Sequence, residues 1–94
     1  MVSSLLMNAP VKLAMTLDKL PMRKPAMISA IDWVSMSENE GAQIRNLGLN
    51  EGVEVEKLYQ GMFGMHDPIA LKVGRMMIAI RKSHASAISV DITA

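Results

Sequence analysis

The sequence predicts a mainly β domain: a small barrel of about five strands, with one short capped α-helix between the first two strands and a helical turn before the last strand. Short runs of β-branched, aliphatic and aromatic residues recur along the chain, and glycine or proline separates them. One segment carries both the start and the stop signals of a helix. The length of 94 residues and the hydrophobic content of 50% suit a single compact domain.

Residues 1–15 contain several leucines and methionines but no long apolar run. Lys12 follows these apolar residues, whereas the basic residues of a secretion signal come first. The stretch is also shorter than the ~20 residues that span a membrane as a helix. We therefore expect a loosely attached extension over residues 1–15, either a strand or an arm that docks on a partner. The barrel domain is expected over residues 16–94, without direct membrane insertion.

The barrel is expected to begin with an entry turn at residues 16–21, in which Leu17 and Leu20 lie under the sheet. Two prolines bracket the next few residues and disfavour a helix there. Residues 26–34 follow as the first strand, because their β-branched and aromatic side chains suit a pleated surface.

Local signals define the helix, which is expected at about residues 38–47. Ser37 and Glu40 have the spacing of a capping box, in which each side chain bonds the backbone N–H of the other residue. Gly48 ends the helix and Gly52 forms a turn before the next strand, so both glycines are predicted to have positive φ. The segment has no long apolar stripe, and we expect it to pack as a lid.

The second strand is expected at residues 53–59 and is followed by an irregular loop that ends at Pro68. The side chains expected to point outward from this strand are Glu54, Glu56 and Lys57.

A strand at 69–73 alternates apolar and polar residues, and Gly74-Arg75 fits a two-residue hairpin turn with glycine first. The returning strand is expected at 76–81. A helical turn at 83–87 and a final strand at 88–92 complete the barrel.

Several of these residues also match a known family in order and spacing. They are Leu47-Gly48-Leu49 with Gly52 and Val55, Asp67-Pro68-Ile69, Ile78-Ala79-Ile80-Arg81, and Ala87-Ile88 with Val90. Over about Thr16 to Ile92, the chain resembles the bacterial ferrous-iron transport protein A (FeoA) family, whose fold is a five-stranded SH3-like barrel. It departs from the family pattern at Gln43-Ile44, where an Arg-Leu pair is usual. The loop before Asp67 is also longer and richer in Met and Phe.

The composition argues against several classes of function. Ten Lys and Arg residues against nine Asp and Glu residues give a net charge of +1, which does not favour a nucleic acid partner. The basic residues before the barrel also lack the interleaved aromatic side chains that stack on bases. The chain has no cysteine, no phosphate-binding loop of the Walker type and no nucleophile elbow. We therefore expect no enzyme activity.

The two histidines are weak candidates for metal binding. His66 and Asp67 are adjacent, so their side chains tend to point apart, and His84 lies near the positive charges of Arg81 and Lys82. Ferrous iron favours several His and carboxylate ligands around one point. We expect surface histidines and no cofactor, with weak binding of Fe(II) or another divalent metal as the alternative.

The resemblance implies a cytoplasmic accessory protein of ferrous-iron uptake, which docks on a FeoB-type permease with a G domain and regulates its activity or assembly. It would then lie at the inner face of the membrane through that partner. Two alternatives are a GTPase-activating factor for the G domain and a metal-sensing module like the C-terminal domain of iron-dependent repressors.

The side chains expected at a partner interface are apolar residues of the loop before Asp67 and two arginines. They are Met62, Phe63, Met65, Arg45 and Arg81. Methionine adapts to irregular surfaces, and exposed apolar tips mark contact sites, so this loop is predicted to meet the transporter or another copy of the chain.

Overall fold

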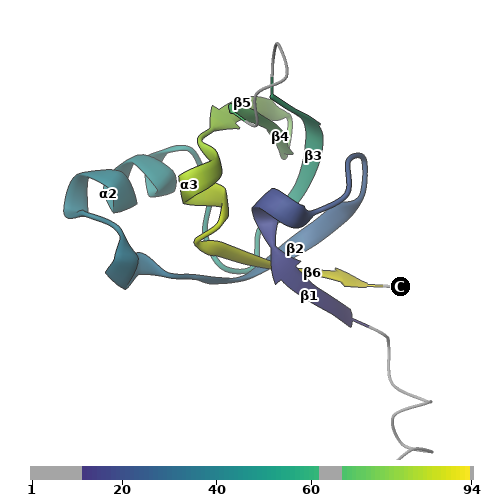
Figure 1. Cartoon of the computed structure of the whole chain (residues 1–94), viewed down its shortest axis with the longest axis horizontal. Coiled ribbons are helices and arrows are strands. Elements are labelled where there is room, and N and C mark those ends of the chain that lie inside the picture. The colour runs from purple at the N-terminus through teal and green to yellow at the C-terminus, as the bar shows by residue number, and fades with distance from the viewer. Residues whose placement is uncertain (1–11, 62–66, 94) are drawn as a thin grey trace, which may run out of the picture.

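The computed structural model describes residues 12–61 and 67–93, and Figure 1 shows their arrangement. The strands are β1 (Lys12–Thr16), β2 (Pro25–Ile31), β3 (Glu54–Gln60), β4 (Ile69–Val73), β5 (Met76–Ile80) and β6 (Ile88–Thr93). The helices are α2 (Glu38–Asn46) and α3 (Lys82–Ala85), and 3-10 turns span Leu17–Lys19 and Trp33–Ser35.

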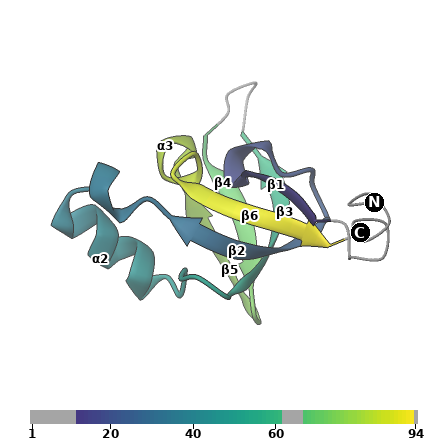
Figure 2. The same cartoon turned by 90° about the horizontal axis from the view of Figure 1, so that it is seen from below.

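All six strands belong to one antiparallel sheet in the order β1-β6-β2-β3-β4-β5. The sheet curls around its core, and β6 lies between β1 and β2 (Figure 2). The mainly β fold class is therefore confirmed, with six strands where about five were expected. The additional strand is β1, which pairs with β6 from Lys12↔Thr93 to Thr16↔Ser89. The domain boundary expected after residue 15 falls inside this strand.

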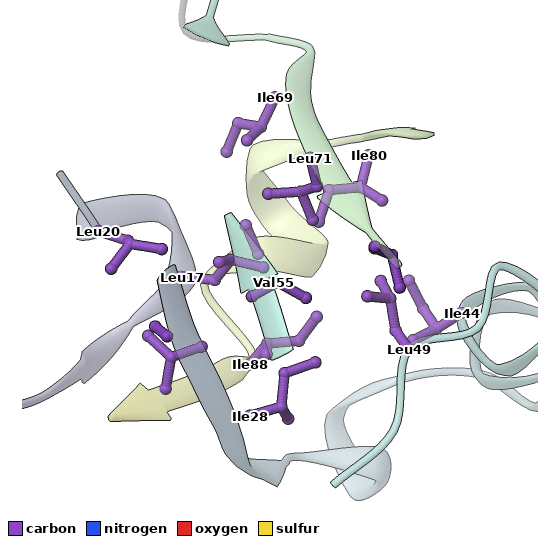
Figure 3. Packing of buried hydrophobic residues seen from close by; sticks show 14 of the residues in the cluster. Leu17, Leu20, Ile28, Ile44, Leu49, Val55, Ile69, Leu71, Ile80 and Ile88 are labelled. Carbon is purple, nitrogen blue, oxygen red and sulfur yellow. The ribbon is translucent and has the colours of Figure 1, made fainter. Parts of the chain in front are cut away.

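The core is a single cluster of aliphatic side chains from the strands, both helices, the first 3-10 turn and two loop residues, Leu20 and Leu49, and Figure 3 shows most of it. Leu17 and Leu20 are buried under the sheet, as expected of the entry turn. Only Ile44 and Gly41 of α2 are buried, so this helix lies beside the barrel and reaches the core through Ile44 (Figure 1). Burial of each large aliphatic side chain contributes on the order of 2 kcal/mol to stability.

Both ends of α2 have the predicted local structure. Ser37 and Glu40 form the capping box, with backbone-to-side-chain distances of 3.0 and 3.1 Å. At the other end Gly48 has φ of +90° and donates to the carbonyl of Arg45, while Leu49 donates to the carbonyl of Ile44. These two bonds form a Schellman motif, in which the left-handed residue is glycine. Gly52 has φ of +87°, also as predicted.

Two predictions were wrong. The strand expected over residues 26–34 is β2, which ends at Ile31, and Trp33 and Val34 belong to the 3-10 turn that leads to α2. Lys57 was expected to point outward but is 3% exposed, because strand alternation from Val55 places it on the inner face. A bulge between Lys57 and Tyr59 then leaves Tyr59 half-exposed.

The remaining turns position the last third of the chain. Gly74 has φ of +61° in the two-residue turn between β4 and β5, which is the glycine-first geometry that the sequence indicated. The Asp67-Pro68 peptide bond is cis, and the Pro68 carbonyl accepts from Gly61 at 2.8 Å. Within residues 12–61 and 67–93, no helix is long and apolar enough to cross a membrane.

Candidate functional site

A groove of about 400 Å³ separates α2 from the corner where β5 runs into α3. Its lining residues come from α2 (Glu40, Gln43, Ile44), the residue after it (Leu47), the end of β5 (Ala79, Ile80) and the start of α3 (Arg81, Ser83, His84). We call three apolar lining residues that are buried or partly buried (Ile44, Leu47 and Ile80) the floor of the groove, and three exposed polar ones (Gln43, Arg81 and Ser83) its rim. Such a groove offers apolar area with polar groups around it, which suits binding of another molecule.

Glu40 and His84 meet across this groove. The Nε2–H of His84 donates to Oε2 of Glu40 at 3.0 Å, and the other carboxylate oxygen accepts from the backbone of Ser37. The bonds from Ser37 and the bond from His84 lower the pKa of Glu40 to about 2. The carboxylate is therefore ionised at neutral pH, and both of its oxygens have partners.

The start of α3 holds Arg81 at the rim. The Asp67 carboxylate accepts from the backbone N–H of Lys82, which satisfies one of the free donors at the beginning of this short helix. Arg81 has extended backbone, and its carbonyl accepts from the backbone N–H groups of His84 and Ala85, whereas its exposed side chain makes no hydrogen bond to another described residue. Its guanidinium is therefore available to an acidic group.

Arg45 lies on another face of α2, in a second depression that it lines together with Trp33 and Gly41. Its guanidinium carbon is 4.2 Å from the centroid of the Trp33 ring, a cation–π geometry. The Trp33 ring also lies near Gly41, where an added Cβ would be 3.5 Å from Cε3, and its Nε1–H donates to Glu51 at 3.1 Å. The arginine thus covers the tryptophan that joins α2 to the preceding turn.

The predicted site residues therefore do not form one cluster. Arg81 lines the groove and Arg45 lies in the other depression, because positions 40, 43, 44 and 47 share one face of α2 and positions 41 and 45 another. Met62, Phe63 and Met65 lie outside the described residues, so their role at an interface stays a prediction. Sequence reasoning missed the Glu40–His84 contact, since 44 residues separate the two.

The groove brings together two side chains of the types that bind metals. Glu40 and His84 bond each other, and in the described ranges no group of three His, Cys, Asp or Glu residues could hold an ion. This pair alone would supply fewer protein ligands than iron or zinc usually takes.

The chain was compared with known proteins. The model of the FeoA domain matches residues 15–92. The zinc-complexed FeoA of Stenotrophomonas maltophilia, described as a procaryotic SH3 domain protein, is 30% identical; the match covers 82% of this chain and 89% of that one, with a TM-score of 0.68. Iron(II) transport protein A of Clostridium thermocellum is 28% identical, with coverages of 83% and 45% and a TM-score of 0.73. This chain thus spans less than half of that protein. A comparison with curated proteins finds no match.

A further solved structure shows a likeness of fold alone. IdeR from T. acidophilum is 23% identical, with coverages of 89% of this chain and 36% of that one and a TM-score of 0.70. The family model, by contrast, covers most of the chain, including β2 to β5 and all but the last residue of β6. The expected SH3-like barrel is confirmed, and the chain belongs to the FeoA family.

Proposed function

We propose that this chain is a non-catalytic accessory protein of ferrous-iron uptake, which docks at the cytoplasmic face of a G-domain-bearing iron permease and regulates it. The observation that carries the proposal is the match to the FeoA domain over residues 15–92. The site geometry supports a binding role. The groove is open, and its one carboxylate, that of Glu40, is already bonded on both oxygens, so this carboxylate is not a free general base for a substrate.

The groove beside α2 is the docking surface that we assign to this role. Its floor includes the buried side chain of Ile44 and the partly exposed side chain of Leu47, and Arg81 at its rim is free to meet an acidic group. Interfaces typically combine an apolar centre with a polar rim and often include arginine.

The test is co-purification of the tagged chain with the permease from membranes, together with uptake of ferrous iron by cells that lack the native accessory protein. We expect the wild-type chain to bind and to restore uptake. Leu47→Glu should weaken both, because it places a charge on the apolar floor. Met22→Glu is the matched control, since it introduces the same charge at a residue that is 55% exposed on the turn before β2 and does not line the groove.

The same samples separate the two alternatives. A GTP hydrolysis rate that rises with the added chain, and falls again in Arg81→Ala, would favour a GTPase-activating role. Retention of one metal ion per purified chain, lost in His84→Ala, would favour metal sensing. Absence of binding to the permease, with uptake unaffected by the chain, would refute the proposed function.

A further inference from the structure

The free edge of β5 offers backbone hydrogen bonds to another strand. β5 pairs with β4 and with no other described strand. Because a two-residue turn joins the two strands, the backbone groups of Met76, Ile78 and Ile80 bond to β4. The N–H and C=O groups of the alternate residues, Met77 and Ala79, point away from β4. An unpaired row of this kind is a template for an added strand.

This edge runs into the groove. Ala79 and Ile80 line the groove on the side of β5, and Ile44 and Leu47 line it on the side of α2. The strand is also apolar where it is exposed, since Met76 is 54% exposed and Met77 is 63% exposed. A segment that bonds to Met77 and Ala79 could therefore place apolar side chains against both β5 and α2.

Positive charges lie at both ends of the edge. Arg75 precedes β5 and Arg81 follows it, and both are exposed. If a second copy of the chain paired with β5 in full antiparallel overlap, Arg75 would lie opposite Arg81 of that copy at each end. Like charges opposite each other destabilise strand pairing. The charge pattern thus disfavours a second copy and favours a segment with carboxylates.

We propose that the β5 edge binds an extended segment of a partner protein, which adds as a strand through Met77 and Ala79. The segment would carry apolar residues in its centre and acidic residues near Arg75 and Arg81. Strand addition of this kind takes its affinity from the main chain and its specificity from alternate side chains. The proposal rests on the docking role above only for the identity of the partner; the mode of binding is tested without the permease.

The first measurement is amide hydrogen exchange by NMR on the full chain. In the free protein the amides of Met77 and Ala79 should exchange fast and those of Ile78 and Ile80 slowly, since only the latter bond to β4. The probe is a synthetic peptide of alternating valine and threonine with glutamate at each end. On binding, it should slow exchange at Met77 and Ala79. A peptide with lysine at each end is the control.

Two variants test the contacts. Ala79→Pro removes a donor that faces the edge while keeping every bond to β4, and it should weaken peptide binding about tenfold or more. Arg75→Glu with Arg81→Glu should weaken binding of the glutamate peptide about tenfold and strengthen binding of the lysine peptide. This reversal of preference cannot come from loss of folding.

Several results would overturn the proposal. One is binding of the peptides without slower exchange at Met77 and Ala79. Others are absence of saturable binding by either peptide, or a dimer of the chain that Ala79→Pro dissociates, which would assign the edge to a second copy. Permease binding that is insensitive to Ala79→Pro, combined with no peptide binding, would leave the proposed function standing while refuting strand addition.

Discussion

Replacement of Gly48 by alanine isolates the cost of one backbone angle. Gly48 has φ of +90°, and a Cβ built there would have Val73 Cγ1 as its nearest neighbour, at 3.9 Å, which is ordinary contact. Steric overlap with neighbours therefore contributes little. The left-handed region costs an L-residue about 1–2 kcal/mol, so Gly48→Ala should lower the free energy of unfolding by about that amount. For a domain of this size, each kcal/mol corresponds to about 4–8 °C in Tm.

Two further variants test whether the backbone angle at position 48 causes the loss of stability. Gly41→Ala is the matched control, because Gly41 lies inside α2 and its added Cβ would be 3.5 Å from Trp33 Cε3, again an ordinary contact. Alanine is favoured over glycine by about 1 kcal/mol in a helix, so this variant should be more stable than wild type. D-alanine at position 48, introduced by chemical synthesis, prefers positive φ and should not destabilise. Equal losses for L- and D-alanine at position 48, measured by urea unfolding, would refute the reasoning.

Three other predictions follow from the same structure. Because the pKa of Glu40 is lowered in the folded state, the unfolded chain protonates this carboxylate first as the pH falls. The stability that Glu40 contributes is therefore complete above pH ~4.5 and is lost as the pH falls toward 2. The free energy of unfolding of Glu40→Gln should decline less than that of wild type between these pH values, and an equal decline would contradict the assignment. Ile44→Ala should cost about 2–5 kcal/mol in urea unfolding, because Ile44 is the one large buried side chain of α2; a loss below ~1 kcal/mol would show that α2 is only loosely attached. The chain should fold without metal and keep its Tm in the presence of a chelator, and a loss of several degrees would reveal a structural ion.

The parts of the fold that the sequence predicts well are those with local causes. The ends of α2 follow from Ser37, Glu40 and Gly48, each of which acts through backbone groups within four residues. The hairpin at Gly74 is equally local. β1 was less certain because it has only two large apolar residues, Leu13 and Met15, and because its structure depends on pairing with β6, far away in sequence.

The candidate site was only partly predictable for the same reason. Its arginine, Arg81, could be named from the family pattern, but the groove exists because α2 packs beside the β5–α3 corner. The capping box predicts the hydrogen bond that one carboxylate oxygen of Glu40 accepts from Ser37. Only the folded chain shows that the other oxygen accepts from His84. Two features of the sequence disagreed about Lys57: its charge suggested an exposed side chain, and its position in the strand suggested a buried one. The side chain is buried, because acceptors for its ammonium group lie within reach.

The two acceptors of Lys57 affect how the turn after β1 can open. The ammonium of Lys57 donates to the backbone carbonyl of Asp18 at 2.8 Å and to the side chain of Gln60 at 2.7 Å, and burial lowers its pKa. Asp18 lies in the turn that directly follows β1, beside the fully buried Leu17. Fraying of β1 that extended into this turn would take one acceptor from an enclosed cation and expose part of the core. The turn after β1 is therefore expected to open only together with the rest of the barrel, as one cooperative unit, although terminal segments commonly open by themselves.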